Sequence, residues 1–296
     1  MPDLPSYLRW LPFATRKTEL LLAFTCLNFL FVGIDVLMAH SQNNFFRWAL
    51  IPLIFSPVAV LAILAQLRFR TSTVVGRAFR TVMWCGVGVG LAGTFFHLTG
   101  NATGGQESLH RLLVEGSPIA APIAFAGISI FALASEHYRG TLRSSTLLNL
   151  VGLGFLGSVL AAFLDHARIS FTPGYTLIPI VFGTLAAMSC FYLARSRTNP
   201  KETQVHLCIL GLSMVVGLVG AVLHVRGDLA GTESIVWARL LYRNPVLGPL
   251  LFCDLAVLGA LSILPEPDGP STVSADAEMS GRSLFATSTH DTLDQR

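Results

Sequence analysis

Residues 86–100 read GVGVGLAGTFFHLTG, and residues 213–227 read SMVVGLVGAVLHVRG. The second stretch follows the first at an offset of 127 residues, so Gly90, His97 and Gly100 recur without a gap. Both stretches are long and apolar, which is typical of helices that cross a membrane. Their similarity predicts that the chain contains a duplicated unit.

The match extends outward from these two stretches. Residues 51–55, IPLIF, return as residues 178–182, IPIVF, and His40 returns as His166 at an offset of 126. The prolines and phenylalanine that follow residue 100 return as well: Pro118, Pro122 and Phe125 correspond to Pro245, Pro249 and Phe252. Prolines and histidines shared at one offset are hard to obtain by chance from apolar composition. We therefore predict two tandem four-helix repeats, at 19–140 and 141–265.

The composition of the chain predicts an integral membrane protein. Hydrophobic residues make up 52% of the 296 residues and charged residues only 12%, about half of what soluble domains carry. The mean hydropathy is +0.62. The net charge of +3 is small and its basic residues are scattered, which argues against a nucleic-acid partner. The lipid bilayer is the expected partner.

The apolar runs predict an all-α integral membrane protein with about eight transmembrane helices. The runs are continuous and do not alternate, which favours helices over a barrel. Their expected limits are 19–40, 48–67, 81–98, 117–135, 146–166, 174–194, 205–225 and 245–264. Four spans per unit would give both units the same orientation, with a pseudo-twofold axis along the membrane normal.

Lysines and arginines predict the orientation of these helices. They are twice as frequent in the N-terminal segment and the second, fourth and sixth loops as in the others. The richer set contains Arg9, Arg16, Lys17, Arg68, Arg70, Arg77, Arg80, Arg139, Arg143, Arg195, Arg197 and Lys201. Cytoplasmic loops carry this excess, so we expect a protein of the bacterial inner membrane with both termini cytoplasmic. Residues 1–18 would form a cytoplasmic tail, and the polar residues 266–296 a disordered one.

Four histidines are the main candidates for a functional site. They lie at the ends of the first, third, fifth and seventh predicted spans, near the expected non-cytoplasmic surface: His40, His97, His166 and His224. Supporting polar residues lie close by in the sequence: Asp35, Asp165, Asp228 and His110. Imidazoles and carboxylates at one depth can form a metal site or a proton relay. Histidines paired across the pseudo-twofold, His97 with His224 or His40 with His166, could hold haem b or a transition metal. The alternative is that they are interfacial side chains without a ligand.

Small residues lead up to each histidine on one helix face. Gly86, Gly90 and Gly93 precede His97 at spacings of four, three and four, which places all four residues on one side of the helix. Small residues let helices approach closely in lipid. The stripe therefore predicts either close helix packing or a slot for a flat cofactor.

Asp254 is the most unusual single residue. It lies near the middle of the last predicted span, and its counterpart at the offset of 127 is Gly127. A carboxyl at that depth is costly, which makes it a candidate proton or cation site, or a hydrogen-bonded structural residue.

Three functions fit these features. The first is a haem- or metal-binding redox protein using the histidines, and the chain has no CxxCH motif for covalent haem. The second is a transporter of protons or a small solute with Asp254 between the repeats. The third is a non-catalytic assembly or sensor protein whose outer loops or C-terminal tail bind protein partners. Two four-helix halves with duplicated histidines resemble the layout of haem A synthases, although the acidic loop motif of that family is missing.

Overall fold

The computed structural model describes residues 16–41, 44–45, 47–103, 110–196, 199–232, 234–242 and 245–265. All regular structure in these residues is helical. The α-helices are α1 (Lys17–Ser41), α2 (Leu50–Arg68), α3 (Thr73–Thr103), α4 (Ile123–His137), α5 (Gly140–Ala167), α6 (Ile178–Arg195), α7 (Pro200–Leu229), α8 (Trp237–Tyr242) and α9 (Leu247–Ser262). Short helical turns are η3 (Arg47–Ala49), η4 (Arg111–Glu115, a π-helical turn) and η5 (Gly174–Leu177). Of the predicted tails, 1–18 and 266–296, residues 1–15 and 266–296 lie outside the described residues, and Lys17 and Thr18 belong to α1.

Each predicted apolar run corresponds to one α-helix of the structure, and six of these helices are long. Six helical segments are long and apolar enough to cross a bilayer: Lys17–Ser41, Arg47–Arg68, Thr73–Ala102, Gly140–Ala167, Gly174–Arg195 and Pro200–Leu229. The other two, α4 and α9, are apolar but have only 15 and 16 residues. α4 begins at Ile123 and not at the expected residue 117, because Pro118 and Pro122 stand before it in a non-helical turn.

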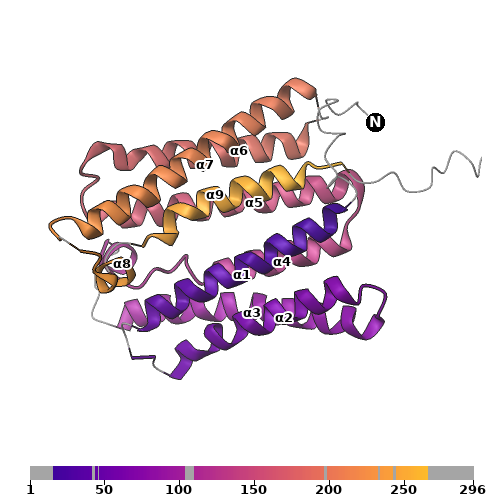
Figure 1. The fold of residues 1–296 in the computed structure, drawn as a ribbon, viewed down its shortest axis with the longest axis horizontal. Coiled ribbons are helices and arrows are strands. Elements are labelled where there is room, and N and C mark those ends of the chain that lie inside the picture. The colour runs from indigo at the N-terminus through magenta and orange to yellow at the C-terminus, as the bar shows by residue number, and fades with distance from the viewer. Residues whose placement is uncertain are drawn as a thin grey trace, which may run out of the picture.

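The long helices form two groups that pack in the same order (Figure 1). In the first half, α1 packs on α2 and α4, and α3 also packs on α2 and α4. In the second half, α5 packs on α6 and α9, and α7 also packs on α6 and α9. The halves meet where α4 lies against α5 and α1 lies against α9. Figure 1 accordingly has α1, α4, α5 and α9 in the middle, with α2 and α3 on one side and α6 and α7 on the other.

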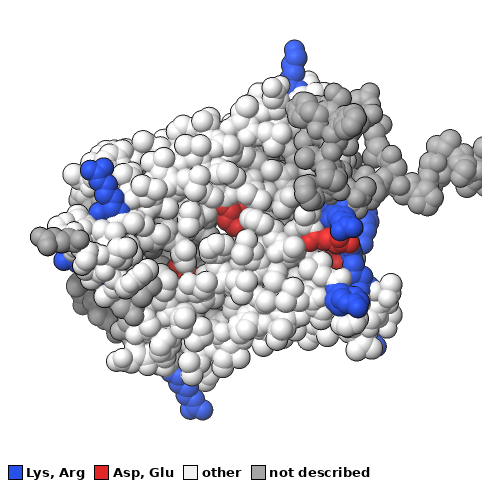
Figure 2. Space-filling model, viewed as in Figure 1, with Lys and Arg blue, Asp and Glu red and all other residues white. Residues whose placement is uncertain are grey.

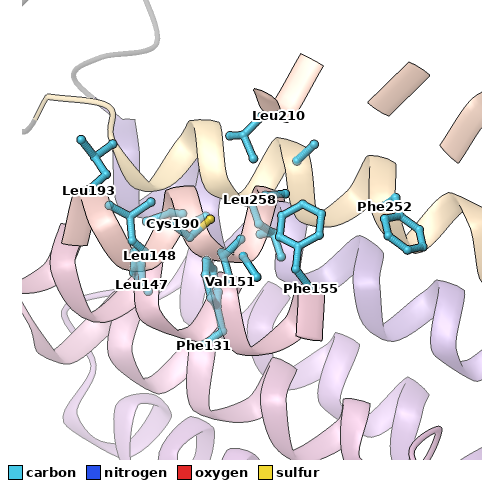
Figure 3. Close-up of a cluster of buried hydrophobic side chains, with 14 of the residues drawn as sticks. Phe131, Leu147, Leu148, Val151, Phe155, Cys190, Leu193, Leu210, Phe252 and Leu258 are labelled. Carbon is cyan, nitrogen blue, oxygen red and sulfur yellow. The ribbon is translucent and has the colours of Figure 1, made fainter. Parts of the chain in front are cut away.

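Each half has its own apolar core. One cluster of buried side chains belongs mainly to the second half and is drawn in Figure 3, where Phe155, Phe252 and Leu210 come from different helices. The other cluster belongs to the first half and includes Phe29 and Phe125. Phe29 and Phe125 have ring centres 6.3 Å apart, and those of Phe155 and Phe252 are also 6.3 Å apart. The two cores are therefore built around the same aromatic contact.

The outer surface is apolar, as lipid contact requires. Large hydrophobic side chains remain widely exposed, including Leu61 at 66%, Val222 at 65% and Val74 at 65%. An exposed apolar surface of this extent marks contact with a membrane or with other proteins. On the face drawn in Figure 2, Lys and Arg lie at the periphery, and only small acidic areas interrupt the uncharged middle. These features fit a polytopic membrane protein.

Candidate functional site

His40 and His97 face each other across the first half. His40 lies in the last turn of α1, and His97 lies in α3 six residues before that helix ends. Their ring centres are 6.2 Å apart and the ring planes stand at 82°. Because α1 and α3 each pack on both α2 and α4, the pair spans the diagonal of the four-helix group.

His166 and His224 repeat this arrangement in the second half. His166 lies near the end of α5, and His224 lies in α7 five residues before its end. Their ring centres are 6.5 Å apart and the ring planes stand at 86°. The four predicted histidines thus form two pairs of nearly equal geometry, one in each half.

The pairing differs from the one expected from the sequence. The offset matches His97 with His224 and His40 with His166, and we expected a ligand to lie between such equivalent residues. Ring contacts join His40 to His97 and His166 to His224 instead. An offset identifies residues with equivalent positions, whereas partners inside a bundle are set by which helices lie opposite one another.

A proline carbonyl orients one histidine of each pair. His97 Nδ1 lies 2.9 Å from the Pro118 carbonyl oxygen, and His224 Nδ1 lies 3.1 Å from the Pro245 carbonyl oxygen. A carbonyl only accepts, so Nδ1 must carry the proton and donate it. The lone pair of the neutral ring is then on Nε2, the state in which imidazole binds a metal.

The spacing of the prolines explains why these carbonyls are available. In a helical turn, the Pro118 oxygen would accept from the backbone N–H of residue 122, and the Pro245 oxygen from that of residue 249. Both positions are proline, which has no N–H. Each carbonyl accepts only a long bond from the N–H three residues on, at 3.4 Å from Ala121 and 3.2 Å from Gly248, and so has room for a histidine 21 residues earlier in the chain. The joint recurrence of the histidines and prolines was the sequence signal for this contact, but the prolines alone suggested only helix starts.

A carboxylate lies beside the second histidine pair. Asp165 interacts electrostatically with His166, His224 and Arg168, and its Oδ1 lies 3.9 Å from Arg168 Nη1. Asp35 interacts electrostatically with Asp165 across the boundary between the halves. Of the predicted supporting residues, Asp165 therefore lies beside the second-half pair, and Asp35 lies within electrostatic range of Asp165.

The other two predicted supporting residues lie differently. Asp228 is fully buried in the last turn of α7 and not in the loop beyond it. His110 stands outside α3, with its Nε2 4.0 Å from Glu115 Oε1. The position equivalent to Asp228 is Asn101, also buried in the last turn of its helix. Asn101 donates to the Leu112 and Ser117 carbonyls at 3.2 and 2.9 Å and so holds the outer segment against α3.

The outer segments cross between the halves. Arg168, just after α5, donates to the Val114 carbonyl and, at 3.0 Å, to the Gly116 carbonyl of the first half. In the other direction, α8 of the second half lies against α1. Each outer segment therefore contacts the histidine-bearing first helix of the opposite half.

Asp254 lies where the two halves meet. Its Oδ1 accepts a hydrogen bond of 2.9 Å from Asn28 Nδ2, which joins α9 to α1. Asn28 also donates to the Phe24 carbonyl of its own helix at 2.9 Å. Sequence reasoning identified the carboxyl but not its donor, because an asparagine within an apolar helix carries no pattern that predicts a partner 226 residues away.

The stripe of small residues is filled by neighbouring helices. A Cβ on Gly90 would lie 2.6 Å from the Ala126 nitrogen, and one on Gly93 would lie 2.7 Å from Pro122 Cβ. In the second half, a Cβ on Gly217 would lie 2.7 Å from the Pro249 oxygen. Packing, and not a cofactor slot, accounts for the stripe.

The donor set limits which metal could bind. In the part of the chain that the structure describes, no group of three or more His, Cys, Asp or Glu side chains is arranged to hold a metal ion. The histidines offer two protein ligands in each half. This number suits a centre whose other ligands come from a macrocycle better than a bare zinc ion, which takes three or four protein ligands.

Comparison with known proteins finds no family model, no curated protein and no solved structure that matches the chain. The architectural resemblance to haem A synthases therefore gains no support from sequence or fold similarity.

Proposed function

We propose that this chain is a membrane redox protein that binds haem b through two histidine pairs, His40 with His97 and His166 with His224. The observation that carries the proposal is the repeated diagonal geometry, with ring centres 6.2 and 6.5 Å apart. Two imidazoles bound about 2.0 Å from one metal on its opposite sides have ring centres about 6 Å apart.

The proline contacts support ligation by Nε2. With the Nδ1 proton donated to a carbonyl, His97 and His224 each keep the Nε2 lone pair. Metal-binding histidines commonly use their second nitrogen in this way, because the contact fixes both the tautomer and the ring direction. Without a CxxCH motif, the haem would be held by these ligands and by packing alone.

The proposal includes a topology of eight crossings in two tandem repeats, 19–140 and 141–265. It is supported by the equal packing order of the halves and by the recurrence of the aromatic and histidine–proline contacts. α4 and α9 would cross with the turns that precede them, since 15 or 16 helical residues span only about 24 Å. In the proposed orientation both termini are cytoplasmic and both haems lie near the opposite surface.

The two haem sites would differ in reduction potential. Asp165 lies beside the second-half pair and interacts electrostatically with Asp35 of the first half. Negative charge near a haem favours its oxidised, more positive form and lowers its reduction potential. We expect the pair next to Asp165, which also interacts with His224, to have the lower potential.

The test is a visible spectrum of the purified protein made with haem available, in the oxidised and reduced states. We expect a Soret band that shifts on reduction and about two haems per chain. His97→Ala should remove about half of the haem, and His97→Ala with His224→Ala nearly all of it. His137→Ala is the matched control, because His137 is exposed at the other end of α4.

An unchanged haem content in the double variant would overturn the histidine assignment. A featureless spectrum from haem-replete cells would overturn haem binding altogether. It would leave proton or small-solute transport past Asp254, at the boundary between the halves, as the function to test next.

A further inference from the structure

The first turns of α3 carry an exposed polar face that the histidine site does not use. Arg77, Arg80, Thr81, Trp84 and Cys85 follow one another along the same side of the helix and are all exposed. Together they form an open surface along α3 and not an enclosed cavity. This face lies at the end of the molecule where α2 turns into α3 and where several Lys and Arg side chains gather (Figures 1 and 2).

The two arginines on this face are not used inside the protein. Neither Arg77 nor Arg80 makes a hydrogen bond or an ion pair with the residues that the structure describes. Arg70, at the same end, does have internal partners: it pairs with Glu19 at 3.3 Å and with Glu136 at 3.8 Å. The guanidinium groups of Arg77 and Arg80 are thus available to an external anion.

The positions of these side chains along α3 indicate which kind of anion they bind. α3 begins at Thr73, so Arg77 and Arg80 lie about 6 and 10 Å along the helix, and Trp84 lies about 6 Å further. Arginine extends toward the phosphate layer of a membrane, whereas tryptophan prefers the boundary between headgroups and acyl chains. A guanidinium also matches a phosphate with two parallel hydrogen bonds.

We propose that this face of α3 is a binding site for the phosphodiester headgroup of an anionic phospholipid. Arg77 and Arg80 hold the phosphate, Thr81 contributes a hydroxyl, and Trp84 lies beside the glycerol and upper acyl chains. The assignment rests on the topology proposed above, in which α3 crosses the bilayer and this end is cytoplasmic. It does not depend on haem.

The second half supplies an internal comparison. At the offset of 127, the equivalent positions of α7 carry neither a cation nor an aromatic side chain: Gln204, Leu207, Cys208 and Gly211. The site is therefore a property of the first half alone. One selective lipid per chain is expected, and not one per repeat.

The experiment uses the fluorescence of Trp84 in a full-length variant whose other tryptophans, Trp10, Trp48 and Trp237, are changed to Phe. The protein is reconstituted in phosphatidylcholine vesicles that contain increasing fractions of brominated phosphatidylglycerol or brominated phosphatidylcholine. Bromine quenches only tryptophans that it touches. We expect about five- to twenty-fold stronger association of the anionic lipid, because each arginine near an anionic headgroup contributes about fivefold.

Arg77→Gln with Arg80→Gln should make the two quenching curves coincide. Arg195→Gln with Lys201→Gln, which removes two cations from the same end of the second half, should leave the selectivity unchanged. The Arg77 and Arg80 changes remove no internal contact, so the thermal midpoint of the variant should equal that of the unaltered protein. A lower midpoint would reveal a folding defect and separate it from a loss of lipid binding.

Equal quenching by both lipids in the unsubstituted background would overturn the proposal. Loss of selectivity when millimolar inorganic phosphate is added would overturn the lipid assignment in favour of a soluble phosphate. If neither brominated lipid quenches Trp84, then α3 does not lie in the bilayer, and the proposed topology fails together with the site.

Discussion

At the scale of single residues, the clearest asymmetry is the hydrogen bond between Asn28 and Asp254. It joins α1 to α9, and the equivalent contact joins α5 to α4. The residues equivalent to this pair are Gly154 and Gly127. The polar contact of one interface therefore has glycines at the equivalent positions of the other half, with no side chains that could form it.

Removing the donor of this hydrogen bond should destabilise the protein. Asn28→Leu leaves the Asp254 carboxyl among apolar neighbours without its amide partner, whereas Asp254→Asn still offers an oxygen to Asn28. Side-chain hydrogen bonds within membranes contribute about 0.6 kcal/mol on average, and an unsatisfied polar group adds about 1–3 kcal/mol. We expect a lower thermal midpoint in detergent for Asn28→Leu and a small change for Asp254→Asn.

The double variant Asn28→Leu, Asp254→Leu provides the control for this prediction. It should be more stable than Asn28→Leu alone, because no buried carboxyl is left without a donor. The cycle is completed by the single variant Asp254→Leu. If the double variant loses the sum of what Asn28→Leu and Asp254→Leu lose separately, the side chains are not coupled.

The sequence revealed the acidic and imidazole residues but not their partners. His40, His97, His166, His224 and Asp254 stood out because polar side chains are rare in such apolar helices. Which histidines form pairs depends on the diagonal order of the helices, which periodicity does not contain. The hydrogen bonds to the proline carbonyls could not be predicted either, because every residue has a backbone carbonyl and the sequence does not show which one a histidine contacts.

At the scale of helices, glycine determines how closely α3 and α4 approach. Gly90 meets the Ala126 nitrogen and the Pro122 oxygen, so α3 lies against the backbone of α4. Gly217 makes the matching approach of α7 to α9. The stripe of small residues predicted this face correctly, because small side chains are what close packing in lipid requires.

Gly90→Ala should be much more harmful than Gly88→Ala in the same helix. The new Cβ of Gly90→Ala would lie 2.6 Å from the Ala126 nitrogen, a backbone atom that cannot move aside alone. At Gly88 there is no atom within 4 Å of the new Cβ. We expect a loss of about 1–3 kcal/mol for Gly90→Ala and none for Gly88→Ala, measured as unfolding in mixed micelles of increasing denaturing detergent. Equal losses would mean that α3 does not approach α4 through Gly90.

Helix limits differ from the predicted ones in two ways. α3, α5 and α7 begin at Thr73, Gly140 and Pro200, five to eight residues before their apolar runs, because a helix continues through polar residues that hydropathy does not count. The other difference lies beside the prolines. The apolar run from residue 117 continues through Pro118 and Pro122, and hydropathy alone cannot separate a turn from a helix there. The structure begins α4 only at Ile123. The same turn supplies the carbonyl that orients His97, so the predicted span and the histidine contact depend on one local feature.

At the scale of the whole molecule, buried cations join the halves at the end opposite the histidines. Lys17 Nζ donates to Ser144 Oγ at 2.9 Å and to the Ser262 carbonyl at 2.9 Å. Arg143, equivalent to Lys17 at the offset of 126, donates to Thr18 Oγ1 at 2.9 Å. Both cations are only 2% exposed. The first turn of each half thus binds the first turn of the other.

Lys17→Met should weaken the association of the halves. The substitution keeps most of the side-chain length but removes the bonds to Ser144 and Ser262. Hydrogen bonds to charged groups contribute about 1.5–3 kcal/mol each before the cost of burying the charge is subtracted. We expect a net loss of about 1–3 kcal/mol, seen as a lower thermal midpoint, and no change for the control Lys201→Met, whose side chain is exposed. A midpoint as high as that of the unaltered protein would mean that the bonds only balance the desolvation of the ammonium group.

The reciprocal contacts of Lys17 and Arg143 have an evolutionary consequence. Each half presents the same patch to the other, which is the isologous interface of a twofold homodimer. Under the duplication proposed above, the single ancestral unit would have had to find a second copy, and its assembly would have depended on its concentration in the membrane. Fusion would have made that encounter intramolecular, at an effective concentration that expression no longer controls. The two halves could then have diverged, so that one interface has Asp254 where the equivalent position of the other is Gly127.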